Sequence, residues 1–252
     1  MRFLALVAGL AALSNTCWAQ AAPPGGAAGA GTAKPVIELF TSQGCSSCPA
    51  ADALLRQYAA RDDIIALSFP VDYWDYLGWK DTLASPKFSE RQRAYAKARH
   101  DGLVYTPQIV VNGLLHVNGS ARDEIEHAMD KTTRTLSSSH IPIQLSTADG
   151  KLTIQTGAAP ENGPTPKEAT LWLLVIAKSV QVAIRRGENE GKTVTYANVV
   201  RDLLPVGTWS GKPLTVRLER HAFMRPGTER CAALLQQANA GPIIGAALLN
   251  QF

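Results

Sequence analysis

Apolar and polar residues in the first half of the chain follow the pattern of strands that alternate with helices. Residues 36–40 and 64–71 are short apolar runs rich in β-branched and aromatic side chains, which is typical of buried strands. Residues 50–60 between them are rich in alanine and leucine and predict a helix. Strand, helix and strand in this order predict a right-handed βαβ unit whose two strands are parallel.

A second helix is predicted over residues 85–100. Ser85 can cap its start and Pro86 suits its first turn, while Gly102 lies just past its end. Its basic side chains predict a solvated face more simply than a ligand site. These side chains are Lys87, Arg91, Arg93, Lys97 and Arg99.

A strand, a hairpin and a last helix are predicted next. Pro107 is expected at the first position of a strand, because proline cannot donate a hydrogen bond to a ladder. Asn112 and Gly113 between apolar runs predict a tight hairpin turn. Ser120, with an acidic residue three positions later, predicts a capping box ahead of a helix over residues 121–135. The predicted order is therefore β-α-β-α-β-β-α.

The second half of the chain changes to a mainly β pattern. Apolar and polar residues alternate on both sides of Asp149-Gly150, which predicts a hairpin, and residues 170–177 and 180–186 predict two more strands. Further strands are predicted at residues 194–209, 213–220 and 243–252. We expect an α/β domain over residues 35–138, followed by a smaller, mainly antiparallel β domain over residues 139–252 and packed closely on the first.

Length and charge are consistent with two domains and narrow the classes of partner. The chain has 252 residues, enough for one large core or two modest ones. Its 25 basic residues are interspersed with 21 acidic ones, so no concentrated basic face for nucleic acid is predicted. The sequence lacks the short motifs of serine hydrolases, zinc proteases, phosphate loops and dinucleotide sites.

The first residues predict a targeting segment. Arg2 precedes an apolar run over residues 3–13, which is too short to span a membrane, and small residues follow at Ala19 and Ala21. We predict a signal peptide over residues 1–21, cleaved after Ala19 or Ala21, and a disordered Gly/Ala/Pro leader over 22–34. A lipoprotein modified at Cys17 is the less favoured alternative. The predicted location is periplasmic or secreted, with no membrane association after cleavage.

The candidate chemistry lies in Cys45-Ser46-Ser47-Cys48, which follows the first predicted strand and opens the first helix. A pair with this spacing can close a small disulfide, and a helix N-terminus favours the thiolate of Cys45. Cys231 lies in an apolar run and predicts a buried strand thiol. In an exported protein, one close pair and one distant cysteine point to a redox pair and a bystander.

Two polar or aromatic loops carry open interpretations. The segment over residues 71–81 either rims the redox site with its rings and accepts protons at its carboxylates, or packs onto the domain, which we favour for most of the rings. The rings are Tyr73, Trp74, Tyr76 and Trp79, and the carboxylates are Asp72 and Asp75. The loop over residues 185–191 is either a polar turn or a binding loop that uses Arg186, Glu188 and Asn189.

Taken together, the motifs carry a family resemblance. Strand-CxxC-helix, a second parallel strand, Thr106-Pro107 and an Asn-Gly hairpin resemble the thioredoxin fold. The strings FTSQGCSSCPAAD, VDYWDYLGWKD, YTPQIVVNG and RRGENEG resemble the bacterial secreted family DUF1223 over nearly all of the chain after the leader. The resemblance implies that Pro107 is cis and faces the disulfide, and that Thr106 meets the substrate chain.

The redox motif departs from that of thioredoxin. No tryptophan precedes Cys45, and Ser46-Ser47 stands in place of Gly-Pro. Small hydroxyl groups can donate hydrogen bonds to the Cys45 thiolate, stabilise the reduced form and make the disulfide more oxidising. We state this as a hypothesis, which a potential near or below that of cytoplasmic thioredoxins would contradict.

Two functions from different classes follow. The first is a thiol–disulfide oxidoreductase in which Cys45 attacks a protein or small-molecule disulfide and Cys48 resolves the mixed disulfide, with no cofactor and no metal. The alternative is a carrier of a soft metal such as copper, bound by Cys45, Cys48 and His116. His116 has no neighbouring ligand spacing, so the pattern favours a packed or solvated ring.

Overall fold

The computed structural model describes residues 33–161 and 168–251. The predicted signal peptide, residues 1–21, and nearly all of the predicted leader, residues 22–34, lie outside these ranges. Within them, no helix has the length and the apolar content that crossing a membrane requires.

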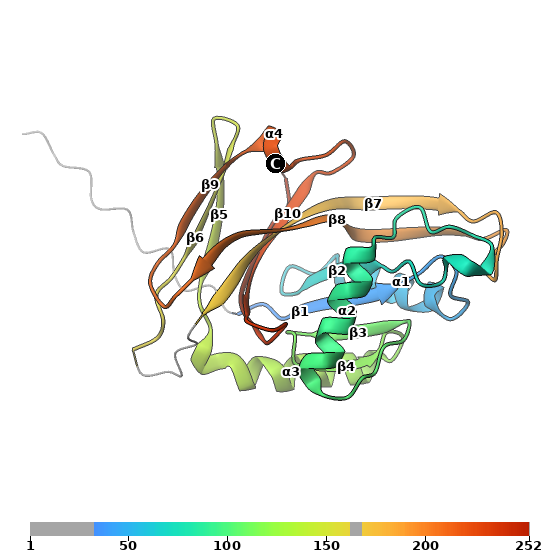
Figure 1. The fold of residues 1–252 in the computed structure, drawn as a ribbon, viewed down its shortest axis with the longest axis horizontal. Helices are drawn as coiled ribbons and strands as arrows, with labels where there is room; N and C mark the ends of the chain where they lie inside the picture. The colour runs from blue at the N-terminus through green and yellow to red at the C-terminus, as the bar shows by residue number, and fades with distance from the viewer. Residues whose placement is uncertain (1–32, 162–167, 252) are drawn as a thin grey trace, which may run out of the picture. The chain divides into compact units, whose positions relative to one another are not determined.

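The first half of the described chain has the predicted order of strands and helices (Figure 1). Its elements are β1 (Val36–Thr41), α1 (Cys48–Tyr58), β2 (Ile65–Pro70), α2 (Pro86–Arg99), β3 (Gln108–Val111), β4 (Leu115–Asn118) and α3 (Arg122–Leu136). Short 3₁₀ turns lie at η1 (Asp75–Leu77) and η2 (Ser137–Ser139). The order β-α-β-α-β-β-α is confirmed.

Strand pairing in this half also follows the prediction. β1 and β2 are parallel, and β3 is antiparallel to both β1 and β4. Between β3 and β4, Asn112 and Gly113 have φ angles of 49° and 70°. These are the left-handed conformations that a tight primed turn requires, so the predicted Asn-Gly hairpin is confirmed.

The second half consists mainly of strands. Its elements are β5 (Ile143–Ala148), β6 (Lys151–Thr156), β7 (Ala169–Ala183), β8 (Thr193–Trp209), β9 (Thr215–Glu219), the short α4 (Arg220–Phe223), β10 (Arg230–Gln237) and β11 (Ile243–Leu249). The hairpin at Asp149-Gly150 is confirmed by the antiparallel pairing of β5 with β6. The predicted break after residue 177 is wrong, because β7 continues and pairs with β8 from Ala169 to Ala183, with two register shifts on the way.

Strands from both halves form one sheet of eight, in the order β11-β10-β7-β8-β2-β1-β3-β4. The halves meet where Ser68 of β2 pairs in parallel with Val199 of β8, and where the Asn198 side chain donates to the Ala66 carbonyl oxygen at 2.9 Å. Among the described strands, β5, β6 and β9 make a separate antiparallel sheet. The fold is thus α/β with a large mixed sheet and a small antiparallel one, and the described residues form one compact unit. The domain boundary after residue 138 stays a prediction.

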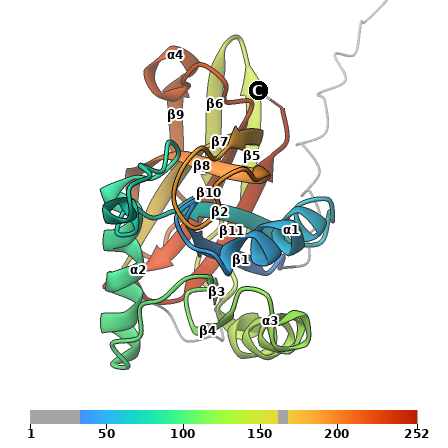
Figure 2. The same cartoon turned by 90° about the vertical axis from the view of Figure 1, so that its right-hand side faces the viewer.

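Helices cover both faces of the β1–β4 part of the large sheet (Figure 2). Val36 and Phe40 of β1 pack on the same side as Phe88 of α2, whereas Ile37 and Leu39 pack with α1 and α3. Side chains alternate between faces along a strand, so one strand serves both cores. This sandwich holds β1 and its carboxyl end firmly in place.

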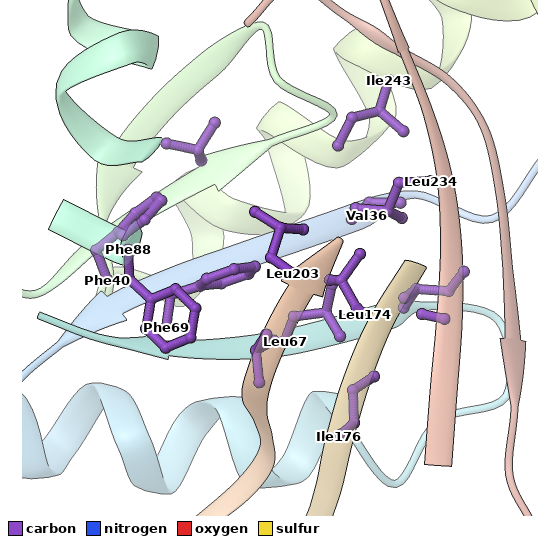
Figure 3. Packing of buried hydrophobic residues seen from close by; sticks show 14 of the residues in the cluster. Val36, Phe40, Leu67, Phe69, Phe88, Leu174, Ile176, Leu203, Leu234 and Ile243 are labelled. Atoms are coloured by element: carbon purple, nitrogen blue, oxygen red, sulfur yellow. The ribbon is translucent and has the colours of Figure 1, made fainter. Parts of the chain in front are cut away.

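An aromatic cluster extends the α2-side core into the second half of the chain. Phe40, Phe69 and Phe88 lie together, with ring centroids 5.5 Å apart for the first pair and 5.2 Å for the second (Figure 3). Leu174 of β7 and Leu203 of β8 belong to the same buried cluster. Burial of this continuous apolar surface explains why the two halves share one core.

The small sheet covers the other face of β7 and β10. Leu152 and Ile154 of β6 pack there with Leu173 of β7 and Cys231 of β10, all fully buried. Cys231 is a free thiol, and burial raises its pKa to about 12. The predicted buried strand thiol is confirmed.

Two local predictions were wrong. Arg91 does not lie on a solvated face: it is buried, and its Nε donates to Glu38 Oε1 at 2.8 Å, because α2 packs over the only acidic residue of β1. Ser120 does not cap α3. Its hydroxyl donates instead to Asn118 at 2.7 Å, and Ala121 occupies the N-cap position.

Candidate functional site

The loop from Ser42 to Ser47 links the end of β1 to the start of α1 and carries Cys45. Two backbone turns shape it, since the N–H of Cys45 donates to the Ser42 oxygen and the N–H of Cys48 to the Cys45 oxygen, both at 3.2 Å. α1 begins at Cys48 with Ser47 at its N-cap position. The pair therefore lies at a helix N-terminus and beyond the carboxyl end of a parallel strand, where open α/β sheets place their sites.

Cys45 and Cys48 form a disulfide with an S–S distance of 2.10 Å and a Cα–Cα distance of 5.4 Å. The hydroxyl of Ser47 lies 3.5 Å from the Cys45 sulfur, which is the contact that the hypothesis on the two serines requires. Ser46 and Ser47 are exposed, whereas Cys45 and Cys48 are only 1% and 0% exposed. In this arrangement the disulfide is buried.

The segment over residues 71–85 packs against the loop from Ser42 to Ser47, which we call the redox loop after the chemistry predicted for its cysteine. Trp79 Nε1 donates to Gln43 Oε1 at 2.8 Å, and the Gln43 N–H donates to Asp81 Oδ2 at 2.8 Å. A Cβ on Gly44 would lie 3.0 Å from the Cβ of Trp74, so glycine admits that ring. The two tryptophans pack as the favoured interpretation predicts, and the surface that they cover is the redox loop itself.

The remaining predicted residues of this segment have other surroundings. Tyr73 donates from its hydroxyl to Gln92 at 3.1 Å, whereas Tyr76 is 79% exposed. Asp75 accepts the N–H of Asp81 at 3.0 Å. Asp72 accepts the Ser89 hydroxyl of α2 at 2.5 Å. Both predicted carboxylates therefore hold the segment in place.

The Thr106-Pro107 peptide bond is cis, as the resemblance implied. Thr106 Oγ1 accepts a hydrogen bond from Trp74 Nε1 at 2.8 Å, which ties this segment to the aromatic one. Pro107 is buried, and a Cβ on Gly119 would meet both Pro107, at 3.0 Å, and Ala51 of α1, at 3.1 Å. Pro107 is thus placed near the first turn of α1.

The loop between β7 and β8 is the third segment that contacts the redox loop. Asn189 is 1% exposed, and its Nδ2 donates to the carbonyl oxygens of Gln43 and Cys45 at 2.9 and 2.8 Å. Glu188 Oε2 accepts the N–H of Ser46 at 3.1 Å, and Lys192 Nζ donates to Asn189 Oδ1 at 2.8 Å. Of the two interpretations, the polar turn and the binding loop, the structure shows a loop bound to this chain's own CxxC segment. Arg186 is exposed.

Sequence reasoning missed Asp52, which lies one helical turn after Cys48 on the same face of α1. It is 2% exposed, and neither carboxylate oxygen has a hydrogen-bond partner in the described part of the chain. Burial raises its pKa to about 8; the nearby Thr41 hydroxyl opposes this shift and the Asp81 carboxylate adds to it. The sequence did contain a signal for Asp52. It is an acidic residue four positions after the second cysteine of CxxC, in a helix that is otherwise rich in alanine and leucine.

The structure separates His116 from the proposed soft-metal ligands. His116 lies on strand β4. Its Nδ1 is 2.9 Å from the Tyr105 hydroxyl, and its Nε2 is 3.3 Å from Asp101 Oδ2. Over residues 33–161 and 168–251, no group of three or more His, Cys, Asp or Glu side chains is arranged to hold a metal ion. Cys45 and Cys48 thus have no third protein ligand in this part of the chain.

Comparison with known families places the chain. Residues 36–236 match the family described as "Protein of unknown function (DUF1223)". The chain belongs to the DUF1223 family. The match extends from β1 into β10, so the DUF1223 region includes the redox loop, the aromatic segment and the β7–β8 loop.

Solved structures share this fold. The chain is similar to a crystal structure of a protein from Agrobacterium tumefaciens, with 36% identity over 86% of this chain and 94% of that one, and a TM-score of 0.75. It is also similar in fold to HBP35 of Porphyromonas gingivalis, with 14% identity over 87% and 76% of the two chains and a TM-score of 0.53. No curated protein matched the chain.

Proposed function

We propose that this DUF1223 protein is an exported thiol–disulfide oxidoreductase whose N-terminal part is thioredoxin-like. The observation that carries the proposal is the Cys45–Cys48 disulfide at the N-terminus of α1. The strand order β2-β1-β3-β4, with β3 antiparallel and helices on both faces, supports the thioredoxin-like assignment. The cis bond before Pro107 supports a role for Thr106 and Pro107 in contacting the substrate.

In the reducing direction, the Cys45 thiolate attacks one sulfur of a partner disulfide. A mixed disulfide forms, and the other partner sulfur leaves as a thiolate. Cys48 then loses its proton and attacks the Cys45 sulfur, which closes the protein disulfide and releases the second partner thiolate. Two electrons pass from the protein to the partner. The oxidising direction is the reverse of these steps.

Asp52 is the acceptor that we propose for the Cys48 proton. A general base works best when its pKa lies near the operating pH, and burial brings the pKa of Asp52 to about 8. At pH 7 most of Asp52 is therefore protonated, and its ionised fraction is the form that accepts the proton. An ordinary thiol has a pKa of about 8.5, so the two groups are matched for proton transfer. The position of Asp52, one turn below Cys48 and away from solvent, keeps this proton inside the protein.

Exchange requires the cover over Cys45, which is the segment over residues 71–85 together with the β7–β8 loop, to open, because Cys45 is 1% exposed. A partner thiol must approach the attacked sulfur in line with the S–S bond. Two hydrogen bonds hold the cover on the redox loop. Asn189 of the β7–β8 loop donates to Cys45, and Trp79 of the segment over residues 71–85 donates to Gln43. The partners that we propose are protein or small-molecule thiols and disulfides outside the cytoplasm.

The test is turnover by the purified mature protein in a coupled assay, in which a dithiol reduces insulin. Cys45→Ser should abolish turnover, and Cys48→Ser should accumulate covalent mixed disulfides that dithiothreitol releases. Cys231→Ala is the matched control, because this thiol is buried and distant in sequence from the pair, and it should turn over like the unmodified protein. Undiminished turnover by Cys45→Ser would end the proposal.

Metal analysis of the same preparation separates this function from the carrier alternative. An oxidoreductase should contain the Cys45–Cys48 disulfide after export and bind copper in less than stoichiometric amounts. Stoichiometric copper that co-purifies with both thiols reduced would favour the carrier instead.

A further inference from the structure

The carboxylate of Glu188 accepts a hydrogen bond from the backbone N–H that follows Cys45. Its Oε2 accepts the N–H of Ser46 at 3.1 Å, and Ser46 is bonded directly to Cys45. By bond lengths alone, this places the carboxylate oxygen within ~8 Å of the Cys45 sulfur. That separation is no longer than the distance over which physiological salt screens charges, about 8–10 Å.

The charge of Glu188 is not neutralised by an ion pair in the described part of the chain. Lys192, a cation of the same loop, donates instead to the Asn189 side chain at 2.8 Å. The other charged groups of this loop, of the segment over residues 71–85 and of the first turns of α1 are Arg185, Arg186, Glu190, Asp72, Asp75, Lys80, Asp81 and the buried Asp52.

We infer that Glu188 is a positioning residue that lowers the reduction potential of the Cys45–Cys48 pair, so that the second half of the chain tunes the redox centre of the first. This inference rests on the proposed function and assigns a regulator to the same site.

The physical reason lies in what reduction creates. A partner dithiol donates two electrons, the bond between the two sulfurs breaks, and the partner closes its own disulfide. The protein is left with a thiolate at Cys45 and, after it takes one of the partner's protons, a thiol at Cys48, while the partner's other proton passes to solvent. A negative charge thus appears beside the Glu188 carboxylate, while the Ser46 N–H that would stabilise the charge is already occupied. Both effects disfavour the reduced form, and the disulfide has no such charge.

Ser47 acts in the opposite direction. Its hydroxyl lies 3.5 Å from the Cys45 sulfur and can donate to the thiolate, which stabilises the reduced form. The two side chains therefore oppose each other at one sulfur. The hypothesis of a more oxidising disulfide considered Ser46 and Ser47 alone. It did not include Glu188, which lies 142 positions after Ser46 in the sequence.

The experiment measures the equilibrium of the pair in glutathione buffers, with the full mature protein and no substrate. Glu188→Gln keeps the shape and an oxygen that can accept the Ser46 N–H, but removes the charge. It should shift the equilibrium constant toward the dithiol about three- to tenfold, where tenfold corresponds to ~30 mV. Ser47→Ala should shift it the other way. Both Glu188 and Glu190 are exposed, but only Glu188 is shown to accept the Ser46 N–H, so the matched control Glu190→Gln should change the constant less than Glu188→Gln does.

The rate of Cys45 alkylation as a function of pH is the second readout. The midpoint of this profile should fall in Glu188→Gln, a change that a purely structural role would not produce. If Glu188→Gln leaves both the constant and the midpoint unchanged while the unmodified protein turns over insulin, the inference is wrong and the proposed function stands. If the shifts are observed but the unmodified protein does not turn over insulin, the proposed function fails and the charge effect stands.

Discussion

Asn189 donates a hydrogen bond from its side chain to the carbonyl oxygen of Cys45 at 2.8 Å, although 144 residues separate the two in sequence. β7 and β8 bring Asn189 to this position, because strands of 15 and 17 residues reach roughly 50 Å across the large sheet. The hairpin tip thus closes over a loop that belongs to the first half of the chain. The surroundings of the cysteine pair therefore come from both halves of the chain.

Asn189→Ala should destabilise the fold and expose the disulfide. It removes both hydrogen bonds to the redox loop and leaves the carbonyl oxygens of Gln43 and Cys45 without these donors, at a cost of ~1–3 kcal/mol. Chemical denaturation measures this loss. The rate at which dithiothreitol reduces the pair should increase, because the cover opens more often.

Gln181→Ala is the control for Asn189, since Gln181 is exposed on the same hairpin. It should change stability by less than ~0.5 kcal/mol and leave the reduction rate unaltered. Equal reduction rates in Asn189→Ala and the unmodified protein would show that this contact does not limit access to Cys45.

Asp52→Asn should stabilise the protein at neutral pH and not at acid pH. The pKa of Asp52 is raised from 3.8 to about 8 by burial, so the folded protein keeps its proton over a pH range in which the unfolded chain releases it. The contribution of Asp52 to the free energy of unfolding is therefore greatest below about pH 4 and falls as the pH rises to about 8. The gain from a non-titrating amide is at most ~4 kcal/mol at pH 7, at ~1.4 kcal/mol per pH unit.

Urea unfolding at pH 4, 5.5 and 7 checks the Asp52 prediction, with Asp62→Asn as the control because Asp62 is exposed. The difference between Asp52→Asn and the unmodified protein should increase with pH, and that of the control should not. A constant difference at all three values would contradict a protonated carboxyl in the folded state.

Arg91→Ala should be among the most destabilising changes on α2. Glu38 and Arg91 are 0% and 7% exposed, and Arg91 also contacts Gln236 at 3.1 Å, so the side chain connects β1, α2 and β10. Its removal leaves Glu38 buried without a cation, which costs ~3–5 kcal/mol. Arg93→Ala on the exposed side of the same helix should cost less than ~0.5 kcal/mol.

A double variant separates the charge of the Glu38–Arg91 pair from its packing. Glu38→Gln combined with Arg91→Met removes both charges and should recover part of the stability lost in the single variant Arg91→Met, which has the same volume at position 91. No recovery in thermal unfolding would mean that the unpaired charge of Glu38 does not carry the effect.

Gly113→Ala should destabilise the β3–β4 turn more than Gly150→Ala destabilises the β5–β6 turn. Both glycines have φ near 70°, so both changes cost ~1 kcal/mol in backbone strain. A Cβ on Gly113 would lie 2.7 Å from the Gly241 carbonyl oxygen, whereas a Cβ on Gly150 meets nothing within 4 Å. The clash should add ~1–3 kcal/mol at Gly113, and equal melting temperatures would contradict it.

Elements whose cause is local could be predicted from the sequence. The apolar run of β1, the helix after Cys48 and the Asn112-Gly113 turn each depend on side chains within a few positions, and all three are confirmed. The cysteine pair belongs to this group as well, because its spacing alone allows the disulfide to close.

Predictions that depended on partners distant in sequence were less successful. Arg91 has the same charge as its exposed neighbours on α2, and nothing in its own helix marks it as the partner of Glu38, 53 positions earlier. Within the large sheet, the second half is paired to the first by a single parallel pair, Ser68 with Val199, and the Asn198 side chain adds a hydrogen bond to Ala66. Neither contact leaves a pattern in the sequence.

For this protein, the sequence by itself determined the chemistry: two sulfurs at a helix start, held by a strand that periodicity reveals. The tertiary structure decided the surroundings of those sulfurs, which are a buried acid at Asp52, indoles at Trp74 and Trp79, and a carboxylate at Glu188. The reason is physical. Burial and charge proximity depend on which segments meet in space, and long-range packing of two apolar halves, rather than any local preference, brings residue 188 to residue 46.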